Sequence, residues 1–150
     1  MIKNIITFKL SDQIFAVDME SVPLILKAKD FLPSNFFLED DFNAFKYGTS
    51  EVQLLNLYEL LDLVPKEIVK ESRILVGEKE GFSYGIIVDE VVEIINLNGN
   101  SKHIYTSAHG KGIPFCDNIL EIEGNEYLLL DIDNILKTVN LKNNKIIVHE

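Results

Sequence analysis

Cysteine and long apolar runs are scarce in this sequence of 150 residues. The one cysteine, Cys116, cannot form an internal disulfide, which favours a reducing compartment. No apolar run approaches the roughly 20 residues that a membrane-spanning helix needs. The apolar stretch 1–10 is interrupted by Asn4, Thr7 and Lys9 before the apolar segment of a secretory signal could form. We therefore expect a cytoplasmic protein.

Basic charge is also in short supply. The chain has 14 lysines and arginines against 24 aspartates and glutamates, a net charge of −10, and no basic run compensates locally. A phosphate backbone would be repelled, so we expect no nucleic-acid partner. The same charge disfavours direct docking on an anionic membrane, and we expect no membrane insertion.

What the sequence does have is apolar residues, 47% of the total, arranged with a period of two. Ile6, Phe8 and Leu10 alternate with polar neighbours, and a second alternating run follows the turn residues 11–13, which predicts a hairpin. Further strands are predicted at 22–28 (with Pro23 at an edge or a strand start), 52–57, 74–76, 82–97 with a bend at 89–90, 119–122, 127–132 and 145–148.

Two short helices are predicted among these strands, at 58–63, ended by Pro65, and at 132–139, with Asp131 or Asp133 as the N-cap. Residues 29–50, which include Phe36-Phe37 and the acidic cluster 39–41, are interpreted as a long loop, and residues 96–112 as a flexible polar loop. Many short strands without strand–helix alternation indicate an all-β fold, a sandwich or barrel, with 1–150 as one domain.

Few residues suggest chemistry. His103 and His109 are six apart in a polar stretch and have no acidic or cysteine partner at ligand spacing. Cys116 beside Phe115 is more typical of a small buried apolar residue than of a thiol nucleophile. Asp131 and Asp133 could share a strand face as a metal-binding pair, but a helix N-cap is the favoured interpretation. No metal site and no catalytic residue is predicted.

Five segments together resemble the CheW family of bacterial chemotaxis coupling proteins. The first hairpin, 8–18, is similar to that family's opening hairpin, and residues 22–25 and 52–57 fall where it has Val-x-Glu-Ile and Val-x-Pro-hydrophobic-x-Asp-Leu. Residues 84–91, Tyr-Gly-Ile-Ile-Val-Asp-Glu-Val, resemble its Gly-hydrophobic-x-Val-Asp-x-Val signature most clearly. The closing hairpin and helix, 119–136, also match in order and spacing.

This resemblance implies two packed five-stranded SH3-like β-barrel subdomains, no catalysis and no cofactor. It implies an adaptor whose partners are the regulatory domain of the histidine kinase CheA and the cytoplasmic tip of a chemoreceptor. Attachment to membrane-associated receptor clusters would then be through those partners.

The sequence departs from the family where partner binding is expected. The family's Asn-Leu-Arg-Gly corresponds to residues 45–48, Phe-Lys-Tyr-Gly, so that Lys46 or Tyr47 replaces the arginine fork and only Gly48 is kept. Leu24 replaces the glutamate of Val-x-Glu-Ile, and Gln53 replaces the proline of the next strand. The predicted protein-binding residues are these substituted positions and the best-matching strand: Leu24, Lys46, Tyr47, Gly48, Gly85, Val88, Asp89 and Val91.

Other interpretations stay open at this point. Gly85, Val88 and Val91 could equally be barrel core. The altered residues 45–48 fit a divergent CheW-like interaction module with another regulatory partner and no receptor coupling. A small β-barrel enzyme or ligand-binding protein that uses His103, His109 or Cys116 is the remote alternative.

Overall fold

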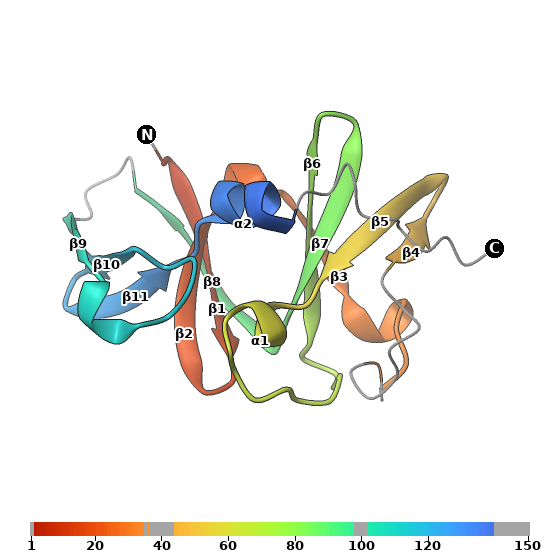
Figure 1. Ribbon diagram of the computed structural model, residues 1–150, viewed down its shortest axis with the longest axis horizontal. Helices are drawn as coiled ribbons and strands as arrows, with labels where there is room; N and C mark the ends of the chain where they lie inside the picture. Colours follow the sequence, from red (N-terminus) through yellow and green to blue (C-terminus); the bar gives the residue numbers. More distant parts are fainter. Residues whose placement is uncertain (1, 35, 37–43, 98–101, 140–150) are drawn as a thin grey trace.

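Two β-sheets lie side by side in the computed structural model, and the helix near the C-terminal end of the described chain lies between them (Figure 1). The structure describes residues 2–34, 36, 44–97 and 102–139. The all-β class with two short helices, predicted from the alternation, is confirmed. The predicted strand 145–148 and the acidic cluster 39–41 lie outside the described residues.

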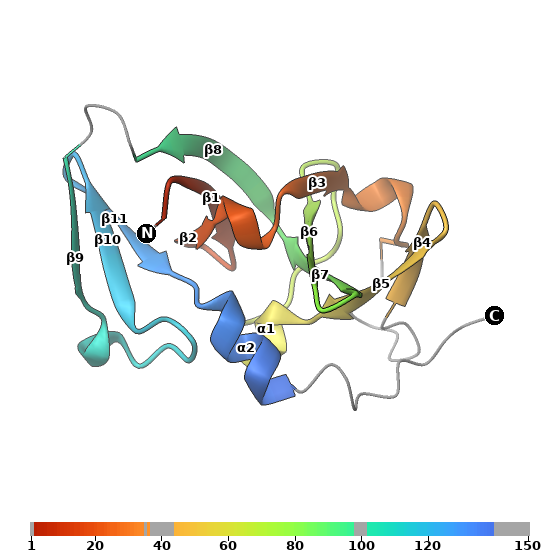
Figure 2. The ribbon, with the colours of Figure 1, turned by 90° about the horizontal axis from the view of Figure 1, so that it is seen from above.

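The first sheet has six strands, and its order begins and ends with strands from the middle of the chain. The order is β8 (Glu90–Asn96), β1 (Asn4–Leu10), β2 (Gln13–Asp18), β11 (Asn125–Leu129), β10 (Asn118–Ile122) and β9 (His103–Ser107). All neighbours are antiparallel except β2 and β11, which run parallel. β8 and β9 are therefore the two edges, and they lie apart in the view of Figure 2.

The second sheet has five strands, in the order β3 (Leu24–Lys27), β6 (Arg73–Lys79), β7 (Phe82–Val88), β5 (Ser50–Leu55) and β4 (Ala44–Tyr47). β5 and β7 are parallel, and the other pairs are antiparallel. Helix α1 (Leu57–Leu60) follows β5, and helix α2 (Ile132–Val139) follows β11. Among the described helices, none has the length and apolar character needed to cross a membrane.

The largest buried cluster joins the two sheets. Phe8 and Phe15 from the first sheet stack with ring centroids 5.6 Å apart, and they belong to the same cluster as Leu75 and Ile86 from the second. Both helices also contribute side chains, such as Ile135 of α2, to this cluster. Two smaller clusters lie within the individual sheets. The apolar residues that alternate in the sequence therefore pack into a core that both sheets share.

Two strands and one helix end differ from the sequence predictions. The first sheet has six strands instead of five, because residues 103–107 pair with β10 along their whole length and are not a flexible loop. Residues 44–47 form β4 inside the predicted long loop, because they pair with β5 through a two-residue turn. Helix α1 ends before Pro65, since Asp62 adopts a left-handed φ of 58°.

Several local predictions are confirmed. Pro23 directly precedes the edge strand β3, where its missing N–H costs no ladder hydrogen bond. The bend at residue 89 separates β7 from β8. Helix α2 begins with Asp131, whose Oδ1 accepts a hydrogen bond from the backbone N–H of Asn134 at 3.0 Å. This capping interaction is the favoured interpretation of the Asp131–Asp133 pair.

Gly77 marks a point where a side chain has no room. A Cβ atom at this position would lie 1.8 Å from the carbonyl oxygen of Ser21 and 2.7 Å from the hydroxyl oxygen of Tyr84. Tyr84 lies opposite Gly77 in the ladder, and its hydroxyl donates a hydrogen bond to that same carbonyl. The glycine is therefore required by the close approach of the residue 19–21 turn to β6.

Asp89 ties three separate segments together at the bend between β7 and β8. Its Oδ2 accepts a hydrogen bond from the backbone N–H of Ser11 at 2.8 Å, and its Oδ1 accepts one from the hydroxyl of Tyr58. Its own N–H donates to the carbonyl oxygen of Lys9 at 3.0 Å. One carboxylate thus joins the first hairpin, helix α1 and the strand that passes from the second sheet to the first.

We expect Gly77→Ala to destabilise the protein by roughly 3 kcal/mol or more, because backbone must move to admit the methyl group. Urea denaturation of the variant measures this. Gly110→Ala is the matched control, since a Cβ at Gly110 meets no atom within 4 Å, and its effect should stay within about 0.5 kcal/mol. Equal stability of the two variants would contradict the packing described here.

We expect stability to fall in alkaline solution. Burial raises the pKa of the Cys116 thiol from 9.0 to about 12 and that of the Tyr84 hydroxyl from 10.0 to about 12. Well below pH 9.0 both groups are protonated in the folded and the unfolded chain, so they add no pH dependence there. As pH rises toward 12, the unfolded chain releases these protons first, and the free energy of unfolding decreases.

Urea denaturation at several pH values tests this expectation. In the Cys116→Ala variant the free energy of unfolding should decrease less steeply with pH near pH 9.0, where the thiol of the unfolded chain titrates before the tyrosine hydroxyl. A free energy of unfolding that stays constant across this range would contradict the burial of these groups.

Candidate functional site

The β4–β5 hairpin holds three of the predicted binding residues on the surface. Lys46 and Tyr47 end β4, both exposed, and Tyr47 pairs with Ser50 across a two-residue turn. Gly48 opens that turn with a φ of 63°, a left-handed conformation that favours glycine. Gly48 therefore has a structural reason to be glycine, and its neighbours present their side chains to solvent.

Tyr47 is held in place by an aromatic cluster. The ring of Phe31 lies 5.8 Å from that of Tyr47 and 5.1 Å from that of Phe45, between centroids. Phe45 is buried, whereas Tyr47 keeps 40% of its surface exposed. A half-exposed tyrosine on a rigid aromatic base, beside a lysine, is a surface suited to contact with another protein.

Leu24 belongs to the other edge strand of the same sheet. It is partly buried, and it packs, like Phe31, against the buried cluster inside this sheet. Phe31 comes shortly after β3 and contacts residues of β4, so the two edges of the five-stranded sheet approach each other. Leu24 and Phe31 thus pack against the same buried cluster, and Phe31, which is not among the predicted binding residues, also contacts Tyr47.

The other predicted binding residues do not form a surface with these. Val88 is completely buried, and a Cβ at Gly85 would lie 3.0 Å from Ile74 Cγ2 and 3.2 Å from Val52 Cγ1. Val91 packs partly buried against the central core. Val88 and Gly85 fit the core interpretation, because the side chain of Val88 is buried and the space beside Gly85 is filled; Val91 is only partly buried.

A mixed-charge cavity of about 450 Å³ opens beside Asp89. The connector between α1 and β6 forms much of its wall, together with the turn of the first hairpin; its lining comprises Lys9, Asp12, Lys66, Glu67, Val69, Glu71, Asp89 and Glu90. This cavity is not evident from the sequence, because the connector that forms it is polar. Val69, an isolated valine in that connector that is 44% exposed, is the one apolar residue of the lining.

One of the two lysines that line this cavity, Lys66, forms an ion pair. Lys66 Nζ lies 2.9 Å from Asp12 Oδ1, and this hydrogen bond raises the pKa of Lys66. Both side chains are substantially exposed, so the pair contributes little to stability. It joins the connector to the turn of the first hairpin across the mouth of the cavity.

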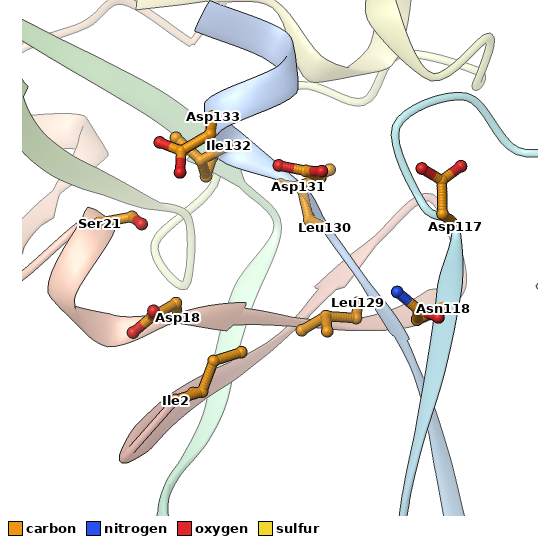
Figure 3. Close-up of a pocket in the computed structure, with 10 residues that line it drawn as sticks. All are labelled: Ile2, Asp18, Ser21, Asp117, Asn118, Leu129, Leu130, Asp131, Ile132 and Asp133. Carbon is orange, nitrogen blue, oxygen red and sulfur yellow. The ribbon is translucent and has the colours of Figure 1, made fainter. Parts of the chain in front are cut away.

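A smaller cavity of about 200 Å³ lies between the start of α2, β2 and β10 (Figure 3). Four aspartates line it, but three have structural partners among the described residues. Asp131 caps α2, Asp18 accepts a hydrogen bond from the N–H of Glu20 at 3.0 Å, and Asp133 lies 3.4 Å from Lys79 Nζ. These contacts account for the carboxylates through helix capping and an ion pair.

The residues considered for catalysis form no described catalytic contact, although the segments of His109 and Cys116 are neighbours, since the N–H of Ala108 donates to the carbonyl oxygen of Asp117 at 2.9 Å. Cys116 is buried, and its raised pKa leaves almost no thiolate at neutral pH, as predicted for a small core residue. His103 belongs to β9, whereas His109 begins a short 3-10 turn. Across residues 2–34, 36, 44–97 and 102–139, no group of three histidine, cysteine, aspartate or glutamate side chains could hold a metal ion.

Comparison with known proteins agrees with this architecture. The family profile described as the CheW-like domain matches residues 4–140. A search of curated proteins found no match. Among solved structures, the scaffolding protein TtCheW from Thermoanaerobacter tengcongensis is similar, with a TM-score of 0.68, 21% sequence identity, and coverage of 87% of this chain and 90% of that chain. Since the profile spans nearly the whole sequence, this chain belongs to the CheW-like family.

Proposed function

We propose that this protein is a non-catalytic adaptor of chemotaxis signalling, which links the regulatory domain of the histidine kinase CheA to the cytoplasmic tip of a chemoreceptor. The match of the CheW-like domain to residues 4–140 carries this proposal. The similar solved structure is itself described as a scaffolding protein. Such an adaptor would work in the cytoplasm, at receptor clusters.

The surface around Tyr47 supports a role in binding. This surface corresponds to the family's Asn-Leu-Arg-Gly motif. Lys46 and Tyr47 lie on the edge hairpin, and the ring of Phe31 packs against the ring of Tyr47. A tyrosine supplies apolar contact area and one hydroxyl, whereas an arginine supplies a charged planar fork. An arginine at residue 47 would suit an acidic partner surface. Because residue 47 is a tyrosine, we infer that the partner surface opposite it is less acidic.

A second candidate function follows from the same observation. Replacement of the arginine fork by Lys46-Tyr47 fits a CheW-like module that binds another regulatory protein and does not couple to receptors. Localisation separates the two: the adaptor collects at receptor clusters in cells, and the divergent module does not.

We expect the protein to bind the CheA regulatory domain encoded in the same genome, as measured by isothermal titration calorimetry. Tyr47→Ala should weaken this binding roughly tenfold, or about 1.4 kcal/mol, because it removes an exposed aromatic side chain from the proposed binding surface. Phe82→Ala is the matched control: Phe82 is 36% exposed at a different turn of the same sheet, and its loss should leave the affinity unchanged.

Lys46→Glu tests the charge at the same hairpin, with the exposed Lys27→Glu on β3 as its control. Absence of binding to both the kinase domain and the receptor tip, with the protein folded, would overturn the adaptor proposal. Binding to the kinase domain without collection at receptor clusters would favour the divergent module.

A further inference from the structure

The four strand edges of the two sheets differ in how they are protected against pairing with another strand. β3 follows Pro23 and carries the exposed Lys27, and β4 carries the exposed Lys46. β8 carries the exposed Glu93, and a bulge shifts its register against β1. Proline, charged side chains and bulges are the usual devices that keep a strand edge from associating.

β9 carries none of these devices. Its sequence, His-Ile-Tyr-Thr-Ser from 103 to 107, contains no lysine, arginine, aspartate, glutamate or proline, and its ladder with β10 is regular over all five residues. Ile104 is 56% exposed and Tyr105 is 44% exposed. β9 is also the outermost strand at its end of the first sheet (Figure 2). This edge therefore presents an apolar, uncharged template for another strand.

The charge around β9 indicates what kind of strand can approach it. Residues 102–111 contain two lysines and two histidines and no acidic residue, although the whole chain has a net charge of −10. Two copies of so acidic a protein repel each other over most of their surfaces. Repulsion is least where acidic residues are few. β9 itself contains none, although burial and the charge of Asp18 on β2 raise the pKa of Tyr105, and Glu121 of β10 pairs with Ile104.

The sequence of β9 also fits itself. In an antiparallel pair about a two-fold axis at Tyr105, Ile104 would lie opposite Thr106 of the other copy, and His103 opposite Ser107. No like charges would be opposed directly, and the Ile–Thr pairs are of the β-branched kind that stabilises sheets. The two copies of Glu121, one strand further in, would lie roughly 15 Å apart, beyond the Debye length at physiological salt.

We propose that two copies of this chain associate through β9, antiparallel and about a two-fold axis at Tyr105, so that their six-stranded sheets become one continuous sheet. Such an isologous contact uses the same patch on both copies and closes after two. The contact is small, so the dimer forms at high micromolar concentration and dissociates on dilution.

Sedimentation equilibrium of the full chain, up to about 1 mM, tests this proposal. The wild type should show a monomer–dimer equilibrium, and Ile104→Lys should weaken the dimer at least tenfold because it puts a charge on the edge. Ile94→Lys is the matched control: Ile94 is 50% exposed on β8, the other edge of the same sheet, and its dimer should match the wild type. A wild type that stays monomeric, or equal weakening by both variants, would overturn the proposal.

A crosslink tests the register. Residues on a two-fold axis of an antiparallel pair face each other at about 4.5–5.5 Å between Cα atoms, within reach of a disulfide. Tyr105→Cys should therefore form a covalent dimer under mild oxidation, whereas Ile94→Cys should not. The native Cys116 does not interfere, because it is only 2% exposed. Equal crosslinking of the two variants would contradict pairing at β9.

Self-association and partner binding can be separated experimentally. β9 lies at one end of the molecule and β4, with Lys46 and Tyr47, at the other, in both views (Figures 1 and 2). Ile104→Lys should weaken the dimer and leave kinase binding unchanged, whereas Tyr47→Ala should weaken kinase binding and leave the dimer unchanged. Failure of one set of results therefore leaves the other proposal intact.

Discussion

The contact between the two sheets through one buried cluster is the constraint on which the rest of the structure depends. Aromatic rings of the first hairpin, Phe8 and Phe15, meet aliphatic side chains of β6 and β7, and both helices close the sides. Asp89 fixes the chain where it crosses from one sheet to the other, since its carboxylate holds Ser11 and Tyr58 at once. Because these contacts hold the interior together, residues at the strand edges and turns can form binding surfaces without a role in the core.

Much of this fold is predictable from the sequence because period-two alternation determines which side chains can be buried. The first hairpin, the bend at Asp89 and an acidic N-cap of α2 follow from local chemistry alone, and the structure selects Asp131 over Asp133 as that cap. β9 and β4 are missed because they are only five and four residues long, and pairing with β10 and β5, not propensity, makes them strands. The order of the strands in each sheet depends on contacts distant in sequence.

The candidate site is only partly predictable. A resemblance identifies positions but gives no information on their exposure. Val88 and Lys46 are therefore equal candidates in the sequence, whereas the structure shows that Val88 is buried and Lys46 is exposed. Phe31 is absent from the prediction because its role, holding Tyr47, arises from the approach of two edge strands. The core is the part of the fold that the family has in common. The substitutions at residues 46 and 47 lie on the surface, where packing of the core does not determine the residue type.

The central claim is that one core makes the two sheets a single rigid scaffold. Native-state hydrogen exchange measures this directly, with the amides of Ile6 in β1 and Ile86 in β7 as probes of the two sheets. The shared cluster predicts that both amides exchange through the same global opening, with equal free energies and equal dependence on denaturant. If one sheet opened at a free energy several kcal/mol below the other, the sheets would be independent units, and the shared core would not be what holds this scaffold together.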